Sequence, residues 1–203
     1  HLVHMPFHIY YQPGQYADAA RVNDAAAASD ETYVQKSGDE GIYRFMYLSH
    51  NYHSAAMSRA MAGNFAEARR AAERLVANVA PAVQAMPMVS AFQPVREAMY
   101  LRFHRWDDVL ALPAPQPSNA VADAFWHFAR ALAFAANGRP ADAERERAAY
   151  AAEKTKVPSD ITFGFNKPDA VYRIGDAVLD ARLAQAHGDR KGAIEAWRRA
   201  VAA

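Results

Sequence analysis

The sequence predicts an all-α protein made of repeated helix pairs, and three observations support this prediction. The chain has 203 residues, of which 52% are hydrophobic, so it is long enough to bury a core. A phrase recurs in which a turn residue stands two positions before an aromatic residue or its substitute and five before a small one. Each copy opens a helical, mostly alanine-rich segment. Because one pair cannot bury both faces, we expect about five repeats to stack into a right-handed solenoid of antiparallel helix pairs with irregular linkers.

The recurring phrase predicts where each helix pair turns. Its copies start at the turn residues Gly14, Gly63, His104, Gly138 and Gly188. A glycine can adopt a positive φ and end one helix, and a second helix then follows after a tight turn. First helices are expected at residues 5–12, 44–61, 92–103, 120–136 and 170–186. Second helices are expected at residues 16–28, 65–79, 106–111, 140–154 and 190–201.

The segments between the predicted pairs have the composition of linkers. Residues 29–41 are polar, and residues 80–94 and 112–119 contain prolines, which interrupt helices. These three segments are predicted to be loops. Residues 156–167 alternate apolar and small side chains, and we interpret them as a loop held by Phe163 and Phe165 rather than as a strand.

Two copies of the phrase resemble the turn and second helix of tetratricopeptide (TPR) repeats. The matching residues are Gly14, Tyr16, Ala19 and Ala26 in the first copy and Gly63, Phe65, Ala68 and Leu75 in the second. The resemblance extends over nearly the whole chain, and the 34 residues from His104 to Gly138 equal the TPR period. It implies that residues 1–203 form a single TPR-like domain. Flanking repeats are expected beyond this sequence, since solenoids need capping repeats.

The histidines are in register with the repeat. Three positions before Gly14 and three before Gly63 share offsets of thirteen, ten and six residues. They are His1, His4 and His8 in the first repeat and His50, His53 and Met57 in the second. Steps of three and four residues place side chains on one stripe of a helix. In TPR proteins that stripe lines the concave groove, so the resemblance implies a groove wall rich in histidine.

A second resemblance rests on the same segments. The phrase His4-Met5-Pro6-Phe7-His8-Ile9-Tyr10, together with His50-Asn51-Tyr52-His53, is similar to a bacterial group of TPR-containing proteins with no assigned biochemical role. That resemblance implies no activity. Pro6 is acceptable in the first turn of a helix, so His1 and His4 are expected to precede the regular helix.

Composition and motifs argue against several classes of function. Twenty-three basic and 22 acidic residues leave a net charge of +1, which disfavours a nucleic acid partner. The absence of cysteine rules out disulfides and thiolate metal sites. The chain is too polar for a membrane span, and we expect a soluble protein of the cytoplasm or periplasm. It contains no phosphate-binding loop, HExxH helix or nucleophile elbow, which makes an enzyme the less favoured class.

The first functional prediction is a binding module whose concave groove accepts a peptide or protein segment. The repeat itself motivates this hypothesis, by analogy with other helical solenoids. The other predicted partner is a second copy of the same chain, in a homo-oligomer. The predicted groove residues are His4, His8, Tyr11, His50, Asn51, His53 and Met57.

The alternative prediction is a transition-metal site for copper or zinc. Neutral imidazoles are common ligands of these ions, and a nearby methionine thioether would favour copper(I). The predicted ligands are His4, His8, His50 and His53. Two further interpretations stay open at this point. The histidines are structural, or one of them is an acid–base catalyst, although no carboxylate stands beside His50 or His53 in the sequence to orient it.

Overall fold

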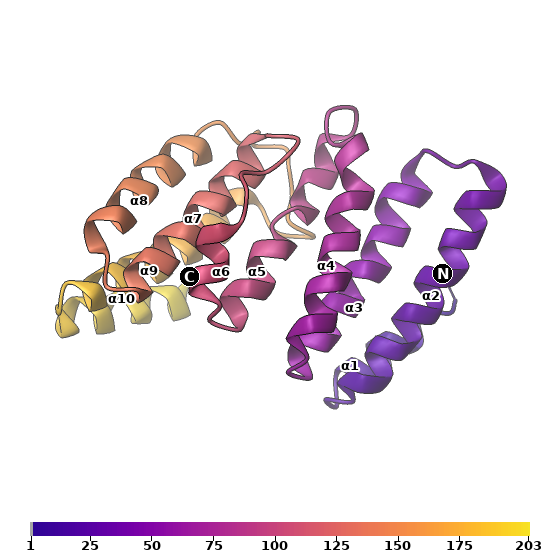
Figure 1. Ribbon diagram of the computed structural model, residues 1–203, viewed down its shortest axis with the longest axis horizontal. Coiled ribbons are helices and arrows are strands. Elements are labelled where there is room, and N and C mark those ends of the chain that lie inside the picture. Colours follow the sequence, from indigo (N-terminus) through magenta and orange to yellow (C-terminus); the bar gives the residue numbers. More distant parts are fainter. Residues whose placement is uncertain (1) are drawn as a thin grey trace. The chain divides into compact units, whose positions relative to one another are not determined.

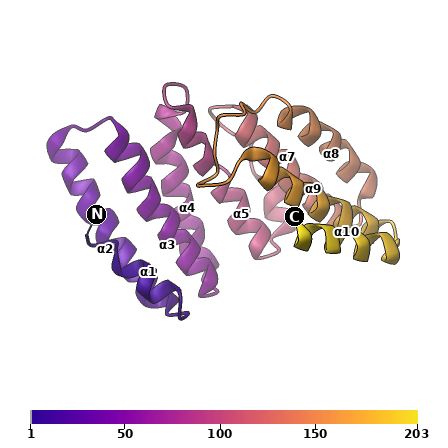
Figure 2. The same cartoon turned by 180° about the vertical axis from the view of Figure 1, so that it is seen from behind.

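A computed structural model describes residues 2–203, and within this range helices joined by turns make up the fold (Figure 1). The chain divides into two compact units, one ending at Phe103 and the other beginning at His104. In each unit, helices that follow one another in the sequence pack as neighbouring pairs (Figure 2). The all-α prediction is confirmed. The TPR-type solenoid and the organisation as one domain stay predictions.

The first unit, here called unit 1, contains five α-helices and three short segments of π- or 3₁₀-helix among its described residues. The α-helices are α1 (Pro6–Tyr11), α2 (Tyr16–Ser37), α3 (Ser49–Met61), α4 (Phe65–Val79) and α5 (Val95–Arg102). The shorter segments are the π-helix η1 (Tyr43–Leu48) and the 3₁₀-helices η2 (Ala80–Ala82) and η3 (Pro87–Phe92). Small buried side chains such as Ala56, Ala68 and Ala72 allow α3 and α4 to approach closely around Leu75.

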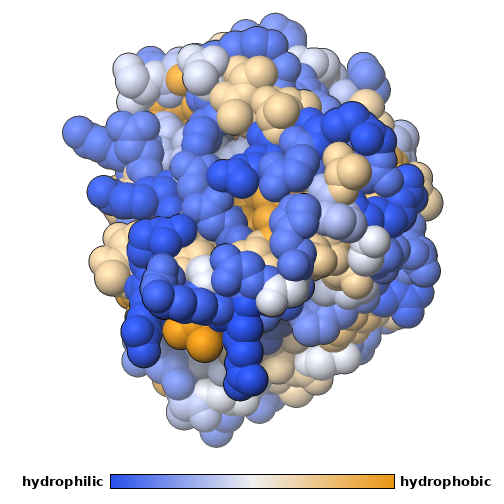
Figure 3. All heavy atoms as spheres, turned by 90° about the vertical axis from the view of Figure 1, so that its left-hand side faces the viewer, coloured by the Kyte–Doolittle hydropathy of each residue, from blue (hydrophilic) through white to orange (hydrophobic). Residues whose placement is uncertain are grey.

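The second unit, here called unit 2, is built from five α-helices. They are α6 (Trp106–Ala111), α7 (Ala120–Ala136), α8 (Pro140–Lys154), α9 (Pro168–Ala186) and α10 (Arg190–Ala202). On the side of unit 2 that Figure 3 turns to the viewer, hydrophilic side chains are interspersed with groups of apolar ones. Across residues 2–203, none of the helices combines the length and the apolar character needed to cross a membrane.

The turn residues behave as the sequence predicts. Gly14, Gly63, Gly138 and Gly188 all have φ between 70° and 83°, the left-handed region that side chains disfavour. His104 occupies the turn position in the third copy of the phrase with a φ of 53°, and its ring stacks on Trp106 at a centroid distance of 5.0 Å. The helices α4, α6, α7 and α8 begin and end at the predicted residues.

Three predictions about individual segments need correction. Helix α2 continues to Ser37, so residues 29–37 are not a loop; Asp30 and Val34 extend its inner face, and Gly38 then caps it by donating to the Val34 carbonyl. The predicted helix at 44–61 starts with the π-helical turn η1, where the Asn78 amide donates to the Arg44 carbonyl.

The third correction concerns the connector between α8 and α9. Phe163 exchanges two backbone hydrogen bonds with Asn166 and packs its ring against Phe125, at a centroid distance of 5.6 Å. Phe165 is fully exposed, so it does not hold the connector as predicted. The segment is a loop, since the Phe163–Asn166 bridge joins single residues and belongs to no strand.

Candidate metal centre

Three imidazoles from two helical segments converge in unit 1. His4 lies in the turn before α1, His8 on α1, and His50 at the second position of α3. The Nε2 atom of His4 is 3.2 Å from Nε2 of His8 and 3.1 Å from Nε2 of His50. One ring nitrogen from each of the three histidines lies within 4.8 Å of the others. The predicted histidine cluster is therefore present, with these three members.

The local sequence explains how the rings meet. Pro6 starts α1, so His4 precedes the regular helix, and its carbonyl accepts a hydrogen bond from the Phe7 amide. His8 follows four residues later and faces the same side. The His4 ring stands edge-on to those of His8 and His50, at interplanar angles of 86° and 65°. Such an arrangement directs nitrogen atoms, rather than ring faces, towards a common point.

Asn23 of α2 determines which nitrogen of His4 carries the proton. Its Nδ2 atom donates to the Ala19 carbonyl at 2.8 Å, so its Oδ1 atom faces His4, 2.7 Å from Nδ1. An amide oxygen can only accept, so the Nδ1–H group of His4 is the donor. The Nε2 atom of His4 therefore has a free lone pair, directed towards His8 and His50. Both Asn23 and His4 are buried, which holds this arrangement in place.

Two nitrogen atoms compete for the single lone pair on Nε2 of His4 if only hydrogen bonds hold the cluster together. A neutral imidazole has one donor and one acceptor nitrogen, and the acceptor has one lone pair in the ring plane. Two neighbouring Nε2 atoms lie at hydrogen-bond distance from Nε2 of His4, but only one N–H group can align well with that lone pair. Hydrogen bonds within the cluster therefore cannot satisfy all three Nε2 atoms well.

The electrostatic environment favours the neutral forms of His4 and His50. Burial is the largest influence lowering the pKa of His4, with the charge of His8 acting in the same direction. Burial, followed by the neighbouring histidines, lowers the pKa of His50 to about 4. Neutral imidazole is the form that binds a metal ion. His8 and His50 are exposed at their outer edges, so the cluster is open to solvent, whereas His4 is only 3% exposed.

The other predicted site residues lie outside this cluster. His53 is half-buried on α3, its ring 6.1 Å from that of Phe92, and burial lowers its pKa. Met57 packs against the core of unit 1, and Tyr11 packs between Phe7 and Tyr16. His1 lies outside the described residues. The roles predicted for His53, Met57 and Tyr11 in a groove stay predictions.

Asn51 follows His50 in the sequence but contacts a different group. It is buried, and its Nδ2 atom donates to Oδ2 of Asp30 on α2 at 2.7 Å. The Tyr43 hydroxyl donates to the other oxygen of Asp30 at 2.8 Å, and this acceptor raises the pKa of Tyr43 to about 12 together with the larger effect of burial. Asn51 is thus committed to the interior of unit 1, between α2 and α3.

Sequence reasoning missed Asn23 and Asp30. They lie seven residues apart on α2, which is two helical turns, among the buried alanines of the same face. An amide and a carboxylate at such spacing on an alanine-rich face were a usable signal for a buried polar contact. Comparisons with protein-family models, curated proteins and solved structures give no match for this chain.

Proposed function

We propose that this protein binds a transition-metal ion through the Nε2 atoms of His4, His8 and His50. The observation that carries the proposal is that the Nε2 atoms of His8 and His50 both approach the lone pair on Nε2 of His4, because a cation can accept the lone pairs of all three atoms at once. Tetrahedral zinc with bonds of 2.0–2.1 Å places neighbouring nitrogen ligands about 3.3 Å apart. The separations of 3.1 and 3.2 Å between these atoms support such a geometry.

The contact between Asn23 and His4 supports the same proposal. Histidines that bind metals commonly donate their second ring N–H group to a side chain or backbone oxygen, which fixes the tautomer and the orientation of the ring. His4 has such a partner in Asn23, and the Ala19 carbonyl holds Asn23 in turn. This chain of contacts leads from the backbone of α2 to the nitrogen that would bind the ion.

The donor set favours particular ions. Imidazole nitrogen suits zinc, copper(II) and nickel, whereas magnesium and calcium prefer oxygen. The cluster supplies three nitrogen ligands from its side chains, and tetrahedral zinc takes four. Water or an added molecule would therefore hold the remaining position, at the edge where His8 and His50 are exposed.

Calorimetry on metal-free protein, purified without a histidine tag, tests the proposal. We expect one equivalent of Zn²⁺ or Cu²⁺ to bind, and His4→Ala and His50→Ala each to weaken binding by at least about a hundredfold, because each removes a ligand. His187→Ala serves as the control, since His187 is half-exposed in unit 2. Binding below about 0.2 equivalents, or affinity unchanged in the two cluster variants, would overturn the proposal.

The peptide-binding hypothesis stays a prediction. Exposed apolar side chains adjoin the cluster, with Met5 43% and Ile9 74% exposed. A partner segment that covers them would lie next to the solvent edge of His8 and His50.

A further inference from the structure

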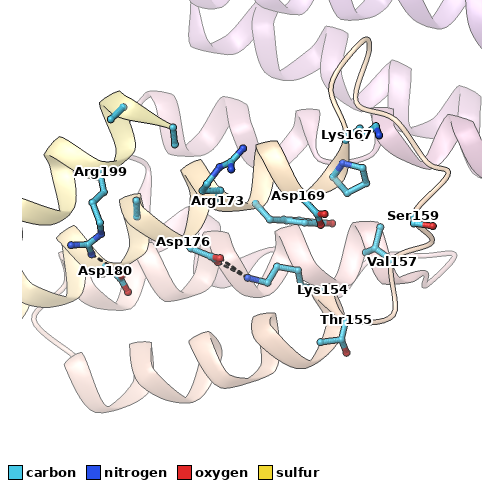
Figure 4. A pocket seen from close by; sticks show the side chains of 15 residues that line it. Lys154, Thr155, Val157, Ser159, Lys167, Asp169, Arg173, Asp176, Asp180 and Arg199 are labelled. Atoms are coloured by element: carbon cyan, nitrogen blue, oxygen red, sulfur yellow. Dashed lines mark hydrogen bonds and ion pairs between the residues drawn. The ribbon is translucent and has the colours of Figure 1, made fainter.

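Unit 2 contains a hollow with a volume of about 880 Å³ (Figure 4). The end of α8, the connector after it, α9 and the last turns of α10 form its walls. Pockets for small molecules commonly have volumes of about 300–1,000 Å³. The size of this hollow thus suits a ligand rather than a single ion.

Four of the charged side chains that line the hollow form two ion pairs. Lys154 pairs with Asp176 at 2.6 Å, and Arg199 pairs with Asp180 at 3.1 Å, as the dashed lines in Figure 4 mark. Asp180 also pairs with Arg147, which does not line the hollow, at 2.7 Å. Among residues 2–203, Lys167 and Arg173 form no ion pair, and both line the hollow. Two cations are therefore available to an incoming anion.

A buried hydroxyl provides an independent sign of a ligand. Tyr172 lines the same hollow, is only 5% exposed, and has a hydroxyl with no hydrogen-bond partner among the described residues. Buried polar groups nearly always have a partner, so such a group calls for an explanation. Burial raises the pKa of Tyr172 to about 12, so the phenol keeps its proton at neutral pH and remains a donor.

We propose that this hollow binds a small organic anion. Its carboxylate or phosphate group lies against Lys167 and Arg173, and its body packs on the apolar wall formed by Val157 and Ala177. After a small rotation of the Tyr172 side chain, its hydroxyl donates a hydrogen bond to an acceptor atom of the ligand.

Asp169 allows the proposal to predict the direction of a change in affinity. It also lines the hollow, has no ion pair among residues 2–203, and stands one helical turn before Arg173 on α9. Its negative charge repels the anion, so its removal should strengthen binding. A hollow that attracts cations or neutral molecules would give the opposite result, or none.

Three matched probes test the proposal by calorimetry at low ionic strength. Benzoate and phenyl phosphate share one ring and differ in the anion, while benzamide is the neutral counterpart. We expect one or both anions to bind and benzamide to bind at least about tenfold more weakly, because charge-assisted hydrogen bonds are the stronger ones. The preferred anion identifies the ligand as a carboxylate or a phosphate ester. Failure of both anions to bind overturns the proposal.

Variants then locate the site. The double substitution Lys167→Gln with Arg173→Gln should weaken binding about tenfold or more. The matched control, Arg190→Gln with Lys191→Gln, removes two exposed cations of α10 that lie outside the hollow and should change affinity less than twofold. Asp169→Asn should strengthen binding. Equal affinity in both double variants, with intact helical circular dichroism, would refute the assignment.

Tyr172→Phe distinguishes a ligand contact from a merely buried hydroxyl. If the hydroxyl serves the ligand, its removal leaves the ligand-free protein as stable as before or more so, yet weakens binding several-fold. Unchanged anion affinity in this variant would exclude the hydroxyl from the site. The inference does not depend on the metal centre, and His4→Ala should bind the anion normally.

Discussion

His4 in unit 1 and His127 in unit 2 share the same spacing to a partner side chain, but the partners differ. In each case Nδ1 contacts a side chain 19 residues later, on the second helix of the pair. The partner of His4 is the neutral amide of Asn23 at 2.7 Å, whereas the partner of His127 is the carboxylate of Glu146 at 2.6 Å. Glu146 also accepts a hydrogen bond from Arg130. One helix-pair scaffold thus supports two different uses of histidine.

The two settings show what a candidate metal ligand needs. The amide beside His4 orients the ring without attracting a second proton, and two more imidazoles face the remaining nitrogen. The carboxylate beside His127 instead also pairs with Arg130, at 2.8 Å. On this comparison we expect His127 to link α7 to α8, and we expect the His4 cluster to bind an ion.

The largest expected effect follows from substitution of Asn23. Asn23→Leu leaves the buried Nδ1–H group of His4 without an acceptor, so metal affinity should fall about 10–100-fold. The unfolding free energy of the metal-free protein should fall by about 1–3 kcal/mol. Calorimetry and urea unfolding measure the two effects. Asn23→Asp keeps an acceptor, and if it binds metal no better than Asn23→Leu, the positioning role of Asn23 is wrong.

The next effect concerns the partner in unit 2. Glu146→Gln removes the charge shared by His127 and Arg130, which are only partly exposed, so the unfolding free energy should fall by about 1–2 kcal/mol. Metal affinity should stay within twofold of the wild type. Thermal unfolding and calorimetry provide the two readings, and a tenfold loss of metal binding would contradict the separation drawn between these histidines.

A smaller effect is expected on acidification of the metal-free protein. The pKa of His50 is about 4 in the folded chain and about 6.5 when unfolded, so the unfolded state binds the proton first as the pH falls. Stability is therefore fully present above pH 6.5 and decreases between about pH 6.5 and 4. Solvent screening at the exposed edge of His50 limits the loss to about 1 kcal/mol. Urea unfolding at several pH values should show that the unfolding free energy of His50→Asn depends less on pH than that of the wild type. The same pH dependence in both proteins would contradict this prediction.

The smallest effect is expected for His53. It faces Phe92 rather than the cluster, so His53→Ala should leave the metal stoichiometry unchanged and alter affinity less than twofold. This experiment decides between the four ligands predicted from the sequence and the three that the geometry favours. A loss comparable to that of His50→Ala would return His53 to the ligand set.

The sequence was most informative where a local rule governs the backbone. Gly63 and Gly138 predict turns, and both adopt a positive φ in the structure. The predicted boundaries of α4 and α8, which follow these turns, match the structure. The extension of α2 to Ser37 was missed because polar residues at 29–37 have the composition of a loop, although Asp30 is buried against α3. Tertiary contacts, which local composition does not encode, decided that segment.

The candidate site was predictable in part for the same reason. His4, His8 and His50 lie ten, six and thirteen residues before their turn glycines, at positions of the predicted stripe. The register matches His4 with His53, however, and the structure instead brings His50 to His4. Asn23 was not predicted because it lies on the second helix of its pair, outside the histidine stripe of the first helices. The hollow in unit 2 depends on the path of the connector between α8 and α9, which has no periodicity that the sequence reveals.

The wide turn η1 affects how the chain tolerates changes in length. A π-helical turn accommodates one more residue than an α-turn without rotating the helix that continues from it. We therefore expect that deletion of a single residue within Tyr43–Leu48 would convert η1 to ordinary helical pitch. His50 would still face His4, and Asn51 would still face Asp30. Helix α3 contains no such π-turn, so a single-residue insertion within it would rotate the residues that follow by about 100° around the helix axis.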